Sequence, residues 1–444
     1  MKNKLISVFL WSMMALVFSG CKIQHKPEED VQLMVDWNHQ ALETEIFTDG
    51  IAVPIAARFY GFYGFIPALA DAYFQQDLMF FKKNFPSLAL PEIEQKKIDR
   101  SIVMNIAYYE FASKYYINLH YKNKESAQQL FEKWDGQTSK NKDKEVVQDS
   151  KILGLQLARA LLQWSSEDSI AHQANLHNFD RNYVPPKEEG KWEIDSEHPM
   201  PALLPTWGKV KPVLLDIDQF KCKPPYAYSR DRSSPYYLDA LELFTISSPL
   251  SYESKWIAEF WSDDVRGLTF TPAGRWISIL NQLVVELESS FDKAKEAYFK
   301  LGIGLCDSGI LAWKNKYIYN VERPASYIRK NIQDAWRPFH ESPNFPAYPS
   351  GHSVFGGVAS EIFTGIFGDK IEFTDKSHEG RKEFLGEPRS FHSIREMAIE
   401  NAYSRIVLGV HFRMDCTEGL RLGSETGKYL LQLDIGGGKS VSKN

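Results

Sequence analysis

The stretch FPAYPSGHSVFGG, residues 345–357, marks the start of a buried helix and a first candidate site. Two prolines and a glycine interrupt the chain here, just before a run of apolar residues. That run has helical spacing and comprises Val354, Phe355, Val358, Ile362, Phe363 and Ile366. We therefore predict that Ser350, Gly351 and His352 lie on the first turn of a helix. Unpaired backbone N–H groups and the positive end of the helix dipole make such a turn a ready anion site.

The composition is that of a folded chain with room for a large core or two ordinary domains. The 444 residues carry a net charge of −5, and 14% of them are aromatic. This balanced charge predicts no nucleic-acid partner, because a nucleic-acid-binding domain needs a marked positive surplus.

The first residues read as an export signal. Lys2 and Lys4 precede an apolar run, Leu5 to Phe18, which is too short to span a membrane. The run ends in VFSGC, residues 17–21, which resembles a bacterial lipoprotein signal. The resemblance implies that residues 1–20 are removed and that Cys21 is lipidated. The alternative is an ordinary signal peptide followed by an incidental cysteine.

These features predict an exported protein that is anchored to the cell envelope by lipid, as a periplasmic or outer-membrane lipoprotein. Residues 21–30 (CKIQHKPEED) are polar and charged, and we interpret them as a tether. No later segment is apolar enough to span a bilayer, so we expect membrane contact through the anchor only. With Cys21 lipidated, three cysteines remain, and this odd count allows at most one disulfide. They are Cys222, Cys306 and Cys416.

The rest of the chain predicts an all-α protein. Helical periodicity dominates residues 31–290, and we expect the polar run 135–145 (DGQTSKNKDKE) to connect two helices. The segment 174–235 is irregular and rich in proline, and its tryptophans suggest that it packs onto the core. We assign 291–435 to a second helical bundle, with helices at 292–314 and near 352–367, 392–408 and 412–432, and 436–444 to a flexible tail. No alternating strand pattern of any length is present.

A second cluster of candidate residues surrounds Lys316 and Arg323. The two are seven residues apart, or two helical turns, so a continuous helix would place both on one side together with Trp313. Pro324 disfavours helix at Arg323 and would free that side chain at a helix end. The alternative is a solvated basic face.

A third cluster contains Ser404, Arg405, His411 and Asp415. On a helix, the Asp415 carboxylate could bond the His411 imidazole four residues away and fix its tautomer. Taken alone, this pair could be structural, and Ser350 could be only a helix N-cap. Taken together, the clusters suit a tetrahedral oxyanion: arginine and lysine neutralise its charge, while a serine hydroxyl and backbone N–H groups fill its remaining acceptors. The two histidines supply a group that attacks or ligates the central atom and an acid–base group.

The order of these motifs resembles a signature shared by type 2 phosphatidic acid phosphatases, bacterial class A acid phosphatases and vanadium-dependent haloperoxidases. The matching positions are Lys316, Arg323-Pro324, PSGH at 349–352, Ser404-Arg405, His411 and Asp415. The wider chain, from about 35 to 432, is similar to the haloperoxidase branch. The segments that carry this likeness are 190–192 (GKW), 205–208 (PTWG), 257–261 (IAEFW) and 271–276 (TPAGRW), together with Trp313.

The resemblance implies two helical bundles, the second carrying a vanadate site that phosphate can also occupy. It implies that His411 ligates vanadium and is oriented by Asp415, and that His352 acts as the acid–base group. Trp313 and Phe345 would line a halide pocket. The substrates implied are hydrogen peroxide and a halide, which is oxidised to a hypohalous species that then halogenates an organic acceptor. The residues implied to hold the vanadate oxygens are Lys316, Arg323, Ser350, Gly351 and Arg405.

Two other functions remain open at this point. The same site would serve an acid phosphatase with His411 as nucleophile and His352 protonating the leaving group. The long N-terminal helical region and Trp313 favour the haloperoxidase over a class A acid phosphatase. A non-catalytic surface lipoprotein is the other alternative. Substitution of His352 or His411 would indicate such a protein, and both histidines are present. Phe345 and Ala347 resemble the chloroperoxidase pattern, but iodoperoxidases also have an aromatic residue at the first position, so the halide is left open.

Overall fold

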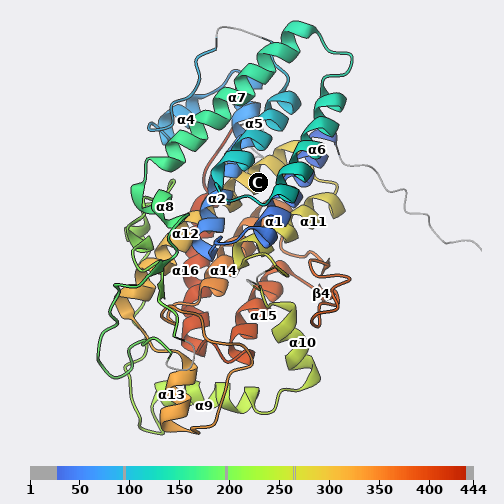
Figure 1. Ribbon diagram of the computed structural model, residues 1–444. Coiled ribbons are helices and arrows are strands. Elements are labelled where there is room, and N and C mark those ends of the chain that lie inside the picture. Colours follow the sequence, from blue (N-terminus) through green and yellow to red (C-terminus); the bar gives the residue numbers. More distant parts are fainter. Residues whose placement is uncertain (1–27, 94–96, 196–198, 264, 266, 437–444) are drawn as a thin grey trace, which may run out of the picture.

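A computed structural model describes residues 28–93, 97–195, 199–263, 265 and 267–436 (Figure 1). The predicted signal peptide, the lipidation site Cys21 and most of the predicted tether lie outside these residues, as does the tail beyond Gly436. The first helix begins at Glu29, so the last two residues of the predicted tether are helical. Acidic side chains at Glu29 and Asp30 favour a helix start there, because they face the positive end of its dipole.

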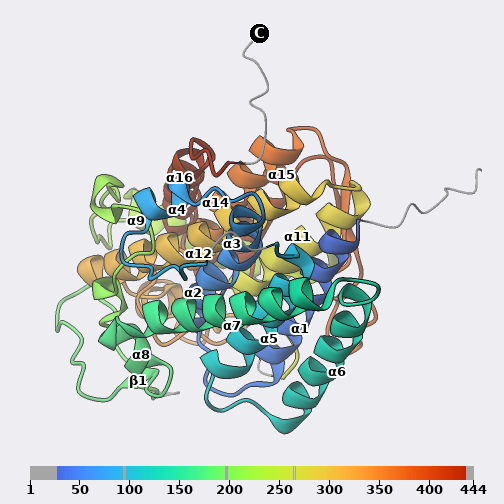
Figure 2. The ribbon, with the colours of Figure 1, turned by 90° about the horizontal axis from the view of Figure 1, so that it is seen from above.

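The N-terminal half consists of helices that gather at one end of the molecule (Figures 1 and 2). Their bounds are α1 Glu29–Phe47, α2 Val53–Tyr63, α3 Phe65–Phe74, α4 Met79–Asn84, α5 Arg100–Tyr115, α6 Tyr121–Thr138, α7 Lys144–Ser166 and α8 Ser169–Ala174. The predicted connection over 135–145 is too long, because α6 continues to Thr138 and α7 begins at Lys144. Asp143 caps α7 by accepting a hydrogen bond from the Glu145 amide at 2.8 Å.

The proline-rich segment has little regular structure and is packed down, as predicted from its tryptophans. It contains the short strands β1 Phe179–Asp180 and β2 Ala202–Leu203, which pair antiparallel, and the 3₁₀ turns η1 Trp207–Lys209 and η2 Ile217–Gln219. Trp192 and Trp207 are both buried. The buried carboxylate of Asp307 accepts hydrogen bonds from the amides of Val213, Leu214 and Leu215 at 2.7, 2.8 and 2.8 Å. These bonds fasten the segment to the helix that carries Asp307.

The C-terminal half confirms a mostly helical fold with one further two-stranded ribbon. Three helices lead into it: α9 Pro235–Ser247, α10 Tyr252–Phe260 and α11 Pro272–Glu286. It continues with α12 Phe291–Tyr319, α13 Pro324–Asn331, α14 Gly351–Phe367, β3 Phe373–Asp375, β4 Arg389–Phe391, α15 Ile394–Val407 and α16 Arg413–Leu431. Phe373 pairs with Phe391 and Asp375 with Arg389 in the β3–β4 ribbon. The predicted helices near 352–367, 392–408 and 412–432 are therefore confirmed to within two residues.

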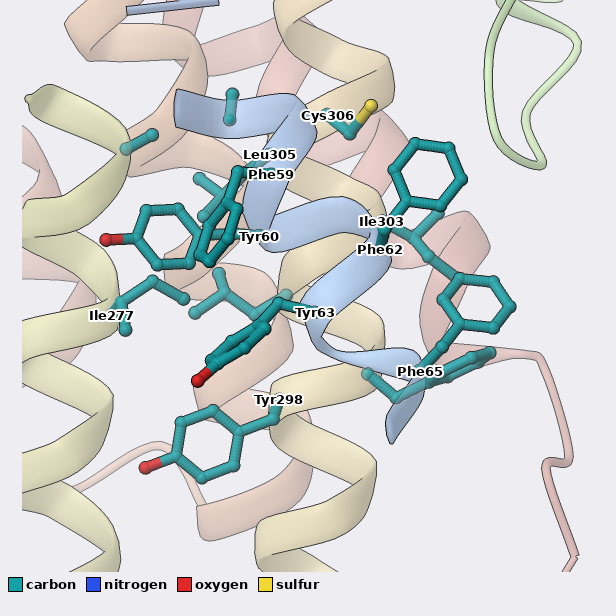
Figure 3. Close-up of a cluster of buried hydrophobic side chains, with 14 of the residues drawn as sticks. Phe59, Tyr60, Phe62, Tyr63, Phe65, Ile277, Tyr298, Ile303, Leu305 and Cys306 are labelled. Atoms are coloured by element: carbon teal, nitrogen blue, oxygen red, sulfur yellow. The ribbon is translucent and has the colours of Figure 1, made fainter. Parts of the chain in front are cut away.

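One hydrophobic core runs through both halves of the chain. Helix α12 crosses the middle of the molecule and packs against α2 and α14 (Figure 2). Aromatic residues of α2 dominate the contact region drawn in Figure 3, where the Phe59 and Tyr63 rings stack with centroids 4.8 Å apart. Tyr298 and Cys306 on α12 are buried in the same cluster. The assignment of 31–290 and 291–435 to separate units stays a prediction.

Helices α14 and α16 approach each other closely because glycines lie at their contact. A Cβ added at Gly423 would lie 2.1 Å from the carbonyl oxygen of Val354, so only glycine fits there. At the same seam, the Ser350 amide donates a 3.0 Å hydrogen bond to the carbonyl of Asp415. The start of α14 is thereby fixed against the start of α16, and both helix starts carry candidate site residues.

Two further sequence-based expectations bear on the fold. Cys222, Cys306 and Cys416 are all free, so the single disulfide that their number would allow does not form. Among the described residues, no helix combines the length and hydropathy that crossing a membrane requires.

Candidate anion-binding active site

Lys316 and Arg323 both bond the loop 345–349, but not by lying on one continuous helix. Helix α12 ends at Tyr319, and Asn320 follows in the left-handed conformation, with φ 53° and ψ 41°. The chain turns there, and Arg323 becomes the residue that precedes α13, whose first residue is Pro324. The prediction that helical spacing places both side chains on one face is therefore wrong, and the turn at Asn320 brings them together instead.

The ammonium group of Lys316 is fully buried and holds the loop that precedes α14. Its Nζ donates to the carbonyls of Pro346, Ala347 and Pro349 at 3.1, 2.9 and 2.6 Å. It also lies 5.1 Å from the centroid of the Phe345 ring. Burial, and then the neighbouring charge of Arg323, hold the pKa of Lys316 well below its usual value.

The Arg323 guanidinium is buried and is held by main-chain carbonyls. Its Nε donates to the carbonyl of Phe345 and its Nη1 to that of Val410, each at 2.9 Å. Nη1 also lies 3.3 Å from Nε2 of His411, whereas Nη2 is buried without a hydrogen-bond partner. Burial lowers the pKa of Arg323 to about 9.

The pair His411 and Asp415 forms as predicted, at the start of α16 rather than along it. His411 precedes the helix, and Nδ1 of its ring lies 2.9 Å from Oδ2 of Asp415. The same carboxylate oxygen accepts from the Phe412 amide at 3.0 Å, while Oδ1 of Asp415 is buried and unpartnered. Burial raises the pKa of Asp415 to about 7, against the pull of Lys316 and Arg323.

This arrangement fixes the imidazole of His411 in one neutral tautomer. Burial, followed by the charges of Arg323 and Lys316, holds its pKa well below the usual value, so the ring is neutral. With Nδ1 directed at a carboxylate, the proton resides there and the lone pair is on Nε2. That nitrogen lies beside Arg323, and it is the atom that a central metal or phosphorus atom would meet.

His352 lies on the first turn of α14, as predicted, and faces Arg405 of α15. Nη1 of Arg405 donates to Nε2 of His352 at 2.5 Å, and the histidine side chain is 17% exposed. Burial and the charge of Arg405 hold the pKa of His352 well below its usual value. Nε and Nη2 of Arg405 are buried without partners, and burial lowers the pKa of this guanidinium to about 10. Ser404, next to Arg405, donates to the carbonyl of Asn401 at 2.6 Å within its own helix.

Ser350 and Gly351 occupy the helix start that the sequence predicts. Ser350 is fully buried and caps α14, its Oγ accepting from the Ser353 amide at 3.4 Å. Among the described residues, a Cβ added at Gly351 would come within 4 Å of the Trp313 ring only, at 3.6 Å. No described protein atom therefore requires glycine here, which agrees with close approach of a ligand to the backbone.

Trp313 and Phe345 form one wall of this region. Their ring centroids are 5.0 Å apart, with planes tilted by 43°. The Phe345 ring also lies 4.8 Å from the Arg323 guanidinium carbon. Trp313 is buried and its indole Nε1 has no hydrogen-bond partner. The predicted halide pocket therefore has its two aromatic side chains in contact, next to the cationic groups.

The sequence motifs missed an acidic neighbour of His352. Oδ2 of Asp263 lies 4.0 Å from Nε2 of His352, and burial raises the pKa of Asp263 to about 7. Arg275 links Asp263, at 3.4 Å, to Asp375, at 2.9 Å. His378 lies 3.6 Å from Oδ1 of Asp263. Asp263 has no local motif; it lies between the two family-like segments 257–261 and 271–276, eight residues before the second.

The donor set fits a tetrahedral oxyanion. Three basic side chains, those of Lys316, Arg323 and Arg405, are buried near one another, and Asp415 is the acidic partner of His411. Three guanidinium nitrogens, on Arg323 and Arg405, are buried and have no acceptor among the residues that the structure describes. Buried donors of this kind are normally satisfied, and a multiply charged oxyanion such as vanadate or phosphate would satisfy them. Lys316 differs, since carbonyls already take its three protons.

Comparison with known proteins finds likeness to vanadium-dependent enzymes. Residues 296–434 match the family model of the second helical-bundle domain of VCPO. A stretch of 218 residues is 26% identical to vanadium chloroperoxidase of Curvularia inaequalis and covers 35% of each chain. A shorter stretch of 94 residues is 32% identical to the vanadium-dependent bromoperoxidase of Ascophyllum nodosum and covers 18% of this chain and 16% of that protein. The matched part is thus well under half the length of either curated relative.

Solved structures extend the likeness to nearly the whole fold. A bacterial vanadium-dependent iodoperoxidase superimposes with a TM-score of 0.77 and 28% identity, covering 91% of this chain and 98% of that one. A bacterial vanadium-dependent chloroperoxidase shares the fold, with a TM-score of 0.61 and 15% identity over 88% of this chain and 95% of that one. The predicted pair His411–Asp415 is in hydrogen-bond contact, as are Arg405 and His352, whereas Ser404 bonds within its own helix. Residues 296–434 are therefore similar to the second helical-bundle domain of VCPO, and the fold as a whole is similar to that of a bacterial vanadium-dependent iodoperoxidase.

Proposed function

We propose that this protein oxidises a halide with hydrogen peroxide in a vanadate-dependent reaction. One halide ion, one hydrogen peroxide and one proton give one hypohalous acid and one water. The observation that carries the proposal is a group of three buried basic side chains, two of them with unpartnered guanidinium donors, close enough to lower the pKa values of two neutral histidines. Vanadate bound there would supply a Lewis-acidic centre that makes peroxide electrophilic toward halide.

The protein would hold the oxyanion with groups of fixed geometry. Arg323 and Arg405 neutralise its charge through their free N–H groups. Ser350 and Gly351 offer the start of α14, and Lys316 contributes its charge from behind the loop. His411 would be the single protein ligand through Nε2, because Asp415 occupies its other nitrogen.

His352 would transfer the proton of hydrogen peroxide. The lone pair of its neutral ring lies on Nε2, the nitrogen to which Arg405 donates, so exchanging this hydrogen bond would let Nε2 accept a proton from hydrogen peroxide and later return it to the departing water. Arg405 holds the ring in place through Nε2. The partial exposure of His352 gives this proton a route to solvent.

Iodide is the halide that we propose. The aromatic pair Trp313 and Phe345 offers an apolar surface beside cations, and iodide is the most weakly hydrated of the three candidate halides, so it loses least on entering such a surface. The bacterial relative with 28% identity is an iodoperoxidase, which supports the same choice.

The test is a titration of the purified protein with orthovanadate, followed by assays of iodide, bromide and chloride oxidation with hydrogen peroxide. We expect oxidation that depends on vanadate, is fastest with iodide and is lost in His411→Ala. Hydrolysis of p-nitrophenyl phosphate is measured alongside. Phosphate release that vanadate inhibits, with no halide oxidation, would replace this proposal by an acid phosphatase acting through a phosphohistidine on the same residues.

We also propose that the protein is exported and lipid-anchored through Cys21. The support is the sequence VFSGC after a short apolar run. Metabolic labelling with palmitate in a bacterial host should mark the wild type and not Cys21→Ser. Equal labelling of both would refute lipidation at this cysteine.

A further inference from the structure

A second pocket, apart from the residues proposed to hold vanadate, lies between Phe345 and the N-terminal helices. It has a volume of about 300 Å³ and is formed by residues from α1, the α1–α2 loop, β1, β2 and the loop that leads to Phe345. Its apolar lining includes Ile46, Ile51, Ala52, Leu203 and Phe345. Phe345 therefore borders two sites, because its ring also contacts Trp313 and the Arg323 guanidinium.

Two side chains give this pocket buried acceptor atoms. Asn178 lines it, and Oδ1 of this amide is buried without a hydrogen-bond partner, while Nδ2 donates to the carbonyl of Gly50 at 2.6 Å. The carboxyl group of Glu45 is buried in the wall and accepts hydrogen bonds from the Tyr60 hydroxyl, at 2.7 Å, and from the Thr271 amide. A ligand that donates one hydrogen bond would satisfy Asn178.

The pocket is fastened to the loop that carries Phe345. The Leu203 amide in β2 donates to the carbonyl of Asn344 at 2.9 Å, and the Phe345 amide donates to the carbonyl of Pro343, also at 2.9 Å. Phe345 in turn supplies its carbonyl to Arg323. These main-chain bonds hold the loop 343–345 in place as a wall that the pocket shares with the oxyanion site.

These features define a ligand class. A volume of about 300 Å³ is at the lower end for small-molecule sites and suits a single ring. Apolar walls favour an aromatic ring, and the free acceptor favours a hydroxyl group. Among the described residues that line the pocket there is no Lys, Arg or His, so an anionic ligand would lack a partner.

We propose that this pocket binds the organic acceptor of the reaction, and that the acceptor is a small neutral phenol. The inference rests on the proposed halide oxidation, because hypohalous acid formed beside Phe345 would reach an electron-rich ring held on the other side of it. In that step, a ring carbon forms a bond to the halogen and the oxygen–halogen bond breaks. Its electron pair leaves with oxygen, and the resulting hydroxide takes the ring proton and departs as water.

Calorimetric titration of the purified protein with phenol, without vanadate or peroxide, tests the pocket directly. We expect one saturable site in the wild type and no measurable binding in Ala52→Trp, which fills the pocket. Ala227→Trp is the matched control, because Ala227 is exposed and lies outside the pocket. Asn178→Leu removes the free acceptor and should weaken binding about five- to tenfold, the equivalent of one neutral hydrogen bond. Melting temperatures of all variants show that each is folded.

Product analysis tests the link to the reaction. Phenol is halogenated by the vanadate-loaded wild type, and the ortho-to-para ratio of the iodophenols is compared with that from reagent hypoiodite. A ratio that differs supports reaction in the pocket, and an identical ratio overturns the acceptor role. Absence of phenol binding in the wild type, or equal binding by Ala52→Trp, overturns the site itself. Phenol binding without any halide oxidation would refute the proposed function and leave the phenol site standing.

Discussion

Nδ1 of His411 lies 2.9 Å from Oδ2 of Asp415, and this single contact determines which nitrogen of the imidazole faces the oxyanion pocket. The carboxylate is itself held by the Phe412 amide, so the ring, the carboxylate and the first turn of α16 form one rigid unit. The site therefore depends on the Asp415 carboxylate, a group that would not touch the oxyanion.

Replacing Asp415 with Asn should weaken vanadate binding while the fold survives. The amide keeps the size of the carboxyl group but loses its charge, so it no longer fixes the His411 tautomer. Partners of this kind are typically worth about 10- to 100-fold in metal affinity. Vanadate is added to the apo protein in steps, and the return of halide oxidation gives the dissociation constant. Circular dichroism provides the folding control. An unchanged dissociation constant would refute the orienting role of Asp415.

The variant Glu45→Gln should change how stability depends on pH. Burial raises the pKa of Glu45 from 4.5 to about 7. Its neutral form therefore contributes stability that is complete below pH 4.5 and is lost as the pH rises through 7. The loss for one such group is on the order of 3 kcal/mol. Urea unfolding at pH 5 and pH 8 should show a smaller decline in the free energy of unfolding for Glu45→Gln than for the wild type. Equal declines would mean that Glu45 ionises normally.

A methyl group at the α14–α16 seam should damage both stability and the site. In Gly423→Ala the new Cβ would lie 2.1 Å from the Val354 carbonyl, which forces the helices apart. We expect a lower melting temperature and weaker vanadate binding, because Ser350 and Asp415 are joined across this seam.

Gly136→Ala is the matched control for the seam variant. Gly136 lies in α6, is exposed, and a Cβ there would meet no described atom within 4 Å. Alanine should stabilise this helix by roughly 0.5–1 kcal/mol and leave vanadate binding unchanged. If both glycine variants behaved alike, close packing of α14 on α16 would not be the cause.

Loss of the Asp307 carboxylate should release the proline-rich segment. Asp307→Ala leaves the amides of Val213, Leu214 and Leu215 without their acceptor in a buried position. The expected loss in the free energy of unfolding is on the order of 3 kcal/mol. Limited proteolysis should cut the variant near residue 213 much faster than the wild type. Identical cleavage rates would show that other contacts hold the segment.

Much of the helical framework could be predicted from the sequence, because the helices of the second bundle are long and strongly periodic. Arg323 and Ser350 were identifiable since each stands beside a signal for a chain break: Pro324 after Arg323, and two prolines before Ser350. Spacing alone misled at Lys316 and Arg323, where the left-handed turn at Asn320 ends the helix between them. Tertiary geometry, rather than a shared helix face, brings these two charges together.

The acidic group near His352 could not be predicted in the same way. Asp263 reaches the site from the segment after α10, 89 positions before His352 in the chain, and no spacing rule joins such distant residues. The halves of the acceptor pocket are similarly remote: Glu45 and Phe345 line the same pocket although they are 300 positions apart in the chain. Local patterns carry no information on contacts of this kind.

The bonds between Lys316 and the loop before α14 have an evolutionary consequence. All three go to main-chain oxygens, of Pro346, Ala347 and Pro349, and none goes to a side chain. Substitutions along this loop can therefore alter the surface offered to a substrate while its backbone stays tied to the same ammonium group. Selection could explore new substrate preferences at position 345 or 347 without first rebuilding the charged centre, provided that the lysine is kept.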